Sequence, residues 1–321
     1  MINVFVFLTR CVLCLAAGLA VASAQDLRLI TLVVPFSAGS AQDVFARMIS
    51  EPLGQELRAR VLVVNKAGAG GTLGAAFVAH AKPDGDTLLM AASGHHLSGV
   101  LYPKLSYHPV NSFRGAAFTG SSDFVLVSPT SFKTPDLATF VARVQAQPLA
   151  FNFASAGNGS ITHVGMASFL DRAGLQMVHL PLKGTGEIIN ELLAGRVQAA
   201  MVSAFSMQAY KADPRLKMLA TTDTRRSDQI PELPTMHESG YPHYKWTAWT
   251  GLLAPAGTPI AVLQDINRAA AKVFEEPQTK ARLQQLGLTI RSMPVAQFES
   301  LLRDDWSQTA AQLTHIKNPL N

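Results

Sequence analysis

Apolar runs alternate with amphipathic stretches along most of the chain. Residues 28–36 are almost continuously apolar, a pattern typical of a strand that is buried on both faces of a parallel sheet. In residues 41–57, apolar side chains recur every three or four positions, which predicts an amphipathic helix. Further strands are predicted at 61–65, 87–92, 123–128, 150–155, 177–182, 197–203, 217–222 and 246–254, and further helices at 72–81, 136–147, 161–173, 187–194, 259–274, 277–286 and 294–315.

This alternation is typical of βαβ units, in which a helix connects two parallel strands of one sheet. We therefore predict an α/β fold with mostly parallel sheets and flanking helices. A proline-rich stretch at 231–242 interrupts the pattern, and 321 residues are enough for two domains. We expect domain 1 to comprise residues 25–124 and 250–321, and domain 2 to comprise residues 125–249, so that the chain crosses between the domains twice.

The first residues have the pattern of a secretion signal. Arg10 is the only charged residue before Asp26, an apolar run covers residues 11–22, and Ala22-Ser23-Ala24 provides a small-x-small cleavage site. The apolar run is shorter than the roughly 20 residues that a transmembrane helix needs. We predict that residues 1–24 are a signal peptide, cleaved after Ala24, and that the mature protein is periplasmic. An uncleaved membrane anchor is the alternative.

Composition narrows the class of protein. Apolar residues make up 48% of the chain and charged residues 15%, as in compact globular proteins. The formal net charge of +5 is scattered, and the one dense basic pair, Arg225-Arg226, has no aromatic residues around it, so no nucleic-acid partner is expected. Both cysteines, Cys11 and Cys14, lie in the predicted signal peptide, so the mature chain has no disulfide. We expect a monomer.

The loop after the first predicted strand is a candidate ligand-binding segment, because ligands of open α/β sheets lie beyond the carboxyl ends of the strands. Ser40 and Asp43 have the spacing of a capping box, and Gly39 allows a close turn. Backbone amides at a helix N-terminus suit a carboxylate. An ordinary strand-to-helix loop explains the segment equally well. The candidate contacts are Phe36, Ser37, Ala38, Gly39, Ser40 and Asp43.

A glycine-rich segment follows the second predicted strand. Gly68, Gly70 and Gly74 are spaced G-x-G-x-x-x-G, which departs from the G-x-G-x-x-G of dinucleotide-binding proteins, and no acidic residue ends a following strand about 20 residues later. We therefore predict no nucleotide and no other cofactor. The glycines still allow a ligand to approach the backbone closely. The candidate contacts are Ala69 and Gly70 here, and Ser93 after the third strand.

The middle of the chain contains the most distinctive loop, at residues 154–163. Two glycines, an asparagine and hydroxyl side chains precede a predicted helix, with Ser160 at its N-cap. His163, in the first helical turn, orients the loop more readily than it catalyses a reaction. Lys183 could attract a carboxylate, and a solvated surface lysine is the alternative. The candidate contacts are Ser155, Asn158, Gly159, Ser160, His163, Lys183 and Ser203, the last at the end of a strand.

The sequence contains no recognisable catalytic or metal-binding set. It has no G-x-S-x-G, no H-E-x-x-H, no Walker loop and no spaced cysteines. His95 and His96 are adjacent, and on a strand their side chains would point to opposite faces without a carboxylate or cysteine to complete a site. We therefore predict no catalytic residues and no metal, and expect that the protein is not an enzyme.

Taken in order, these segments resemble the Bug or TctC family, the substrate receptors of tripartite tricarboxylate transporters. The resemblance runs from residue 29 to residue 306 and rests on these strings: VVPF (33–36), GAGG (68–71), PDG (83–85), SAGNGS (155–160) and GLLAPAGTP (251–259). It implies a two-domain, periplasmic-binding-protein-like clamp that holds a carboxylate through loop amides and water. The binding loops would be residues 36–43 and 155–163.

The chain also departs from the family pattern. Ser37-Ala38-Gly39-Ser40 stands where the family usually has Pro-Pro-Gly-Gly, and Leu182 stands where Pro-Tyr-Lys-Gly usually has its tyrosine. The ligand class therefore stays open among dicarboxylates, tricarboxylates, acidic amino acids and aromatic acids.

Three hypotheses for function follow. The leading one is a receptor that delivers a small carboxylate to the membrane subunits of a tripartite transporter. The second is an input protein for a periplasmic sensor, with the same binding chemistry and a sensor ectodomain as its partner. The third, a periplasmic enzyme of unknown class, is disfavoured by the missing catalytic set.

Overall fold

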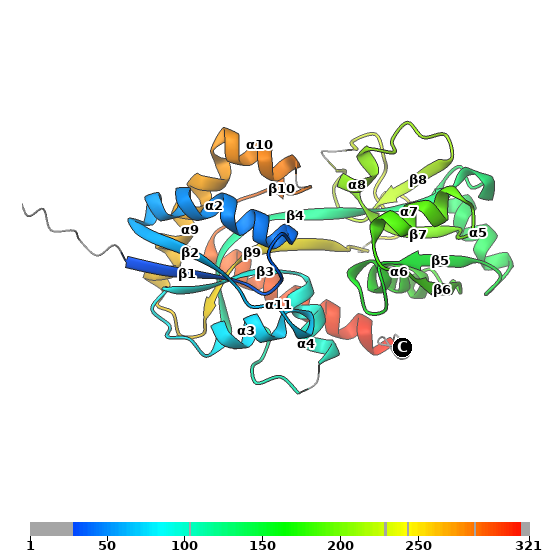
Figure 1. The fold of residues 1–321 in the computed structure, drawn as a ribbon. Coiled ribbons are helices and arrows are strands. Elements are labelled where there is room, and N and C mark those ends of the chain that lie inside the picture. The colour runs from blue at the N-terminus through cyan, green and yellow to red at the C-terminus, as the bar shows by residue number, and fades with distance from the viewer. Residues whose placement is uncertain (1–27, 103, 228–229, 243, 286, 316–321) are drawn as a thin grey trace, which may run out of the picture.

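The computed structural model describes residues 28–102, 104–227, 230–242, 244–285 and 287–315, and these form two lobes joined by long strands (Figure 1). The predicted signal peptide, 1–24, lies outside the described residues. The strands are β1 (Arg28–Val34), β2 (Ala59–Asn65), β3 (Thr87–Ala92), β4 (Phe113–Pro129), β5 (Asn152–Ser155), β6 (Val178–Pro181), β7 (Ala199–Ser203), β8 (Leu216–Thr221), β9 (Thr247–Pro255) and β10 (Thr289–Ile290). The helices are α2 (Ala41–Leu57), α3 (Thr72–Ala79), α4 (Gly94–Leu101), α5 (Leu137–Ala146), α6 (Ile161–Arg172), α7 (Thr185–Leu193), α8 (Ala204–Gln208), α9 (Ile260–Glu275), α10 (Pro277–Gln285) and α11 (Val295–His315), with 3-10 turns at Ala69–Gly71 and Thr130–Phe132.

One strand, β4, belongs to both lobes. The sheet order is β2-β1-β3-β9-β4-β7-β5-β6, with β8 and β10 also paired to β4. From Phe113 to Asp123, β4 pairs with β9, and from Phe124 onward it pairs with β7 and β8. The pairing partner of β4 therefore changes between Asp123 and Phe124. β9 runs in the opposite direction beside it (Figure 1).

The α/β class with flanking helices is confirmed, but the expectation of mostly parallel sheets is wrong. Among the described strands, four pairings are parallel, namely β1 with β2 and β3, and β5 with β6 and β7. Five pairings are antiparallel, and all of them involve β4 or β9. For the two pairings of β9, the physical reason is that β9 returns from the second lobe and inserts between β3 and β4, so that no crossover helix sets its direction.

Most predicted elements are observed within a few residues. The bounds of α2 and β3 coincide with the prediction. The strand predicted at 123–128 is only the end of β4, which has 17 residues. The prediction also missed α4, and placed His95 and His96 on a strand although they lie on this helix. The prediction missed α4 because this helix begins with Gly94 and two histidines, although Leu97, Val100 and Leu101 have helical spacing.

Each lobe has an apolar core of its own. In the first lobe, Phe45 of α2 and Phe274 of α9 pack together on one face of the sheet, with ring centroids 6.1 Å apart, and Phe298 of α11 belongs to a separate buried cluster. Leu97 of α4 and Leu313 of α11 pack into the core of the second lobe. These two helices therefore connect the lobes. No described helix is both long and apolar enough to cross a bilayer.

Candidate functional site

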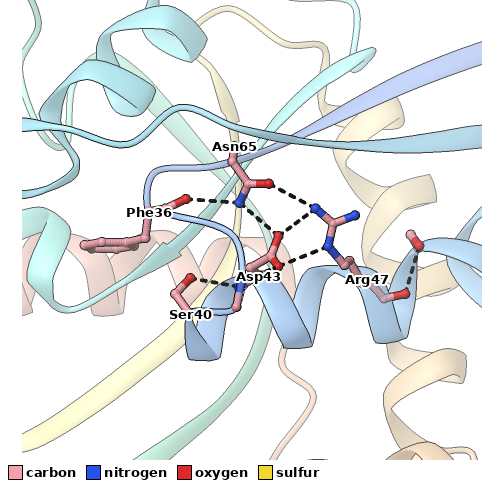
Figure 2. Close-up of polar contacts among 7 residues, drawn as sticks. Phe36, Ser40, Asp43, Arg47 and Asn65 are labelled. Atoms are coloured by element: carbon pink, nitrogen blue, oxygen red, sulfur yellow. Dashed lines mark hydrogen bonds and ion pairs between the residues drawn. The ribbon is translucent and has the colours of Figure 1, made fainter.

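The loop between β1 and α2 is held by a buried carboxylate. Ser40 caps α2, and its Oγ accepts a hydrogen bond from the Asp43 amide at 3.3 Å. The Asp43 carboxylate is buried and accepts a hydrogen bond from Arg47 Nε at 3.0 Å (Figure 2). It also accepts one from the Gly39 amide at 2.9 Å. The hydrogen bond from Arg47 lowers the pKa of Asp43 to about 2, with smaller contributions from the Gly39 amide and an asparagine amide. The predicted cap is therefore observed, and Asp43 is ionised at neutral pH.

Asn65, the last residue of β2, completes this network. Its Nδ2 donates to the Phe36 carbonyl at 3.0 Å and to Asp43 Oδ1 at 2.9 Å, and its Oδ1 accepts from Arg47 Nη2 at 3.0 Å (Figure 2). The Asp43 carboxylate is thus hydrogen-bonded within the loop region, where it positions the backbone, and it is not a free charge that faces a ligand. Sequence reasoning missed Arg47 and Asn65 as site residues, although the i,i+4 spacing of Asp43 and Arg47 was a usable signal.

The same loop presents unused backbone donors. The amides of Ser37, Ala38, Ala41 and Gln42 donate no hydrogen bond within the described part of the chain. Gly39 has a φ of 82°, a left-handed conformation that favours glycine. Ser37 and Ala38 are exposed. Free amides at the N-terminus of a 17-residue helix form a ready site for an anion.

The loop between β5 and α6 has a similar construction. Ser160 Oγ caps α6 by accepting the His163 amide at 3.2 Å, as predicted. The Gly159 amide donates to His163 Nδ1 at 3.1 Å, so the ring does orient the loop. Gly159 has a φ of 69°. Asn158 is exposed, and neither its amide nor that of Ile161 donates a hydrogen bond within the described residues.

Two stacked histidines pack next to this loop. The rings of His163 and His179 lie 3.8 Å apart at an angle of 5°, and Phe153 stacks on His179 at 4.8 Å. Ser155 Oγ lies 2.7 Å from His179 Nε2. Burial, followed by the nearby His163, lowers the pKa of His179 to about 4, and burial also lowers the pKa of His163. Both rings are therefore neutral at pH 7. Sequence reasoning missed His179, because its partners lie on other elements.

The other predicted contacts lie on other segments of the chain. Ser93 Oγ accepts from the Trp249 amide at 2.7 Å and so ties the end of β3 to β9. Ser203 caps α8, with its Oγ 2.8 Å from Ser206 Oγ. Lys183 is exposed, and its amide donates a hydrogen bond to Glu187 Oε2, while its side chain makes none to the residues that the structure describes. Ala69 and Gly70 both adopt left-handed backbone conformations beside α3, with φ of 47° and 64°.

Two cavities show which predicted residues come together. A cavity of about 40 Å³ is lined by Phe36 and Gly70 among the predicted contacts, and includes no residue of the 155–163 loop. A larger cavity of about 460 Å³, between α11 and the loops at 223–225 and 245–247, contains none of the predicted contacts. The ligand-contact role of the predicted residues therefore stays a prediction. No group of three potential metal ligands occurs among the described residues.

Comparisons with known proteins place this architecture in one family. Residues 45–317 match the sequence model of the tripartite tricarboxylate transporter family receptor, TctC. BugT of Bordetella pertussis is 32% identical over 270 residues, which cover 83% of this chain and 82% of BugT.

Solved structures agree with the sequence match. A TctC solute-binding protein from Polaromonas shares the fold, with a TM-score of 0.83 and 24% identity over 90% of this chain and 99% of that one. MatC from Rhodopseudomonas palustris, solved with bound malate, has a TM-score of 0.68 and 28% identity over 89% of this chain and 99% of MatC. The family consists of receptors and not enzymes, which confirms that expectation. The chain is therefore a solute-binding protein that belongs to the TctC receptor family.

Proposed function

We propose that this protein captures a small carboxylate in the periplasm and delivers it to the membrane subunits of a tripartite transporter. The observation that carries the proposal is the pair of capped helix N-termini, at Ser40 and Ser160, whose loops present free amides. Such amides stabilise a bound anion through hydrogen bonds, without a positively charged side chain. MatC, a relative solved with bound malate, supports the same ligand class.

In this mechanism, the ligand carboxylate accepts hydrogen bonds from the amides of Ser37, Ala38 and Gln42, while the 155–163 loop closes on it from the second lobe. Asp43 would repel the ligand if its charge were unopposed, but Arg47 lies 3.0 Å from its carboxylate and neutralises it. The network of Asp43 and Asn65 keeps the donors in place before the ligand arrives, which reduces the ordering cost of binding.

The clamp itself is part of the proposal. Residues 25–124 with 250–321 would move against residues 125–249 as two domains of a monomer, and β4 and β9 would act as the connection. Export would remove residues 1–24, so the intact mass of the periplasmic protein should correspond to a chain that starts at Gln25. A mass that retains residues 1–24 would contradict the cleavage site.

A thermal-shift screen tests the ligand class. Dicarboxylates, tricarboxylates, acidic amino acids and aromatic acids are compared with sugars and metal cations as controls. A ligand at 100 times its dissociation constant adds about 2.7 kcal/mol to the free energy of unfolding, which is an easily measured shift. Stabilisation by sugars or cations, with none by any carboxylate, would refute the proposal. Delivery is then tested by ligand uptake in vesicles that contain the transporter's membrane subunits.

A further inference from the structure

The outer strand of the first lobe, β2, has an open edge. It stands at one end of the sheet order and pairs only with β1 among the described strands. The Lys66 amide donates to the Val34 carbonyl at 2.8 Å. Because alternate residues of a parallel strand bond to the same neighbour, the even-numbered residues of β2 bond to β1, and the amides of Val61 and Val63 point away from it. No group of the described chain outside the β1–β2 ladder bonds to these two amides.

The strand at the other end of the sheet is protected in the way that edge strands usually are. β6 has only four residues and contains Pro181, which cannot donate to a further strand. β2 has seven residues, contains no proline, and includes the apolar run Val-Leu-Val-Val. A longer apolar edge of this kind is a template on which another strand can pair. β2 is therefore better suited than β6 to add a strand from a partner.

An apolar surface lies beside this open edge. The register with β1 places Leu62 on the same face of the sheet as Val33, which packs with α3 in one buried cluster. Leu62 is nevertheless 44% exposed. Leu73 and Phe77, one turn apart on α3, are 58% and 46% exposed and line one open groove. Large apolar side chains that are exposed on adjoining elements are typical of an interaction surface.

The segment that carries this surface is positively charged. Residues 57–83 include neither aspartate nor glutamate, and their lysines and arginines are Arg58, Arg60, Lys66 and Lys82. None of these four side chains forms an ion pair with a described residue. Lys66 Nζ lies 4.1 Å from the centre of the Phe77 ring, so one of these cations borders the apolar surface directly. A partner that complements this surface is therefore acidic as well as apolar.

The chemistry of this surface favours one kind of partner. A second copy of the chain would bring two positively charged segments together, which disfavours self-association. A lipid surface offers no regular row of backbone donors and acceptors to the edge of β2. An extended protein segment offers such a row, and its side chains can cover the apolar surface at the same time.

The open edge ends beside the candidate binding loop. Asn65, the last residue of β2, donates to the Phe36 carbonyl and to the Asp43 carboxylate. Gly74 of α3 packs against the same loop, since a Cβ there would lie 2.9 Å from Pro35 Cα. A strand added to β2 would therefore lie next to the elements that hold this loop.

We infer that the edge of β2 and the adjoining surface of α3 are the docking site for the transporter's membrane subunits, which add an extended segment with apolar and acidic side chains to β2. The inference rests on the proposed function and deepens it, because it assigns the surface through which the ligand is delivered.

Binding of the mature protein to the membrane subunits in nanodiscs tests the inference. Empty nanodiscs of the same phosphatidylethanolamine and phosphatidylglycerol are the lipid control, and biolayer interferometry measures both. Sedimentation velocity of the protein alone measures self-association. In the complex with the subunits, hydrogen exchange should slow at the amides of Val61 and Val63, because these amides point to the open edge.

Point variants identify the surface. Leu62→Asp and Phe77→Asp should each weaken docking at least about tenfold, as the loss of a side chain at the centre of an interface does. Both residues are almost half exposed, so the variants should keep the melting temperature and the carboxylate affinity of the unmodified protein. Lys66→Glu should slow association and reduce its dependence on ionic strength. Val178→Asp on β6 is the matched control, because Val178 is 45% exposed at the other end of the sheet, and it should leave docking unchanged.

The outcomes separate the two proposals. If the subunits bind while exchange at Val61 and Val63 is unchanged, or while both aspartate variants bind normally, docking takes place elsewhere and the inference is wrong although delivery stands. Equal binding to empty nanodiscs would identify a lipid surface as the partner, and a dimer with slowed exchange at these amides would identify a second copy. Either result overturns the inference. If no carboxylate binds, or if the subunits neither bind the protein nor take up ligand from it, the proposed function fails and the inference fails with it.

Discussion

Gly165, in the second turn of α6, offers the sharpest test of how the second binding loop is supported. A Cβ at this position would lie 2.3 Å from Trp246 Nε1, 2.4 Å from Trp246 Cδ1 and 3.0 Å from Met201 Sδ. Contacts below 3.0 Å force a neighbour to move. The indole is the neighbour that must move, and its Nε1 donates to the Ile161 carbonyl at 2.8 Å. Gly165→Ala should therefore displace Trp246 and break this hydrogen bond.

The expected magnitude follows from competing effects. Alanine favours a helix over glycine by about 1 kcal/mol. Overpacking a buried contact costs about 1–3 kcal/mol, and losing a neutral hydrogen bond costs about 0.5–1.5 kcal/mol. The overpacking and hydrogen-bond terms exceed the propensity term, so we expect Gly165→Ala to lower the free energy of unfolding by about 1–3 kcal/mol. Ligand affinity should fall too, because α6 starts at the 155–160 loop.

Gly186 provides the matched control. It lies in α7, has no positive φ, and a Cβ there would meet nothing within 4 Å. Gly186→Ala should therefore raise the free energy of unfolding by about 0.5–1 kcal/mol. Urea unfolding followed by circular dichroism measures both variants. If Gly165→Ala stabilises the protein as Gly186→Ala does, Trp246 does not pack closely against Gly165, and the reasoning is wrong.

Three further predictions concern the two loops. The folded-state pKa of Asp43 is lowered from 3.8 to about 2, so its carboxylate stabilises the protein fully above about pH 4, and this stabilisation is lost as pH falls toward 2. Between pH 5 and 2, the melting temperature of Asp43→Asn should therefore fall less steeply than that of the unmodified protein. The pKa of His179 is lowered from 6.5 to about 4, so the unfolded chain binds a proton first and stability should decline as pH falls from 6.5 to 4. His179→Phe should make that decline shallower while it keeps the stacking on Phe153, because His163, whose pKa burial also lowers, still contributes to the decline; an unchanged pH profile would contradict the prediction. Ser160→Ala should cost about 0.5–2 kcal/mol of cap stability and weaken ligand binding, whereas Lys183→Ala should change affinity by no more than about 0–1 kcal/mol; calorimetry that gives the reverse order would replace the backbone site with a charge-pair site.

Local sequence patterns were enough to predict the helices that begin at the two candidate binding loops. The bounds of α2 follow from its apolar spacing and from Ser40, whose capping bond to the Asp43 amide spans three residues. The cap of α6 at Ser160 was readable for the same reason. Caps and amphipathic faces are encoded within one helical turn, so neighbouring residues carry the whole signal.

Contacts between distant residues were decided only by the tertiary structure. The sequence predicted the strand at 246–254, but not that β9 returns between β3 and β4 and makes the sheet mixed, because strand order depends on packing over the whole chain. Asn65 contacts Asp43 from 22 residues away, and His179 of β6 stacks on His163 of α6. The sequence alone therefore determined the family, most of the helices and the two loops, whereas the tertiary structure decided which side chains hold those loops in place.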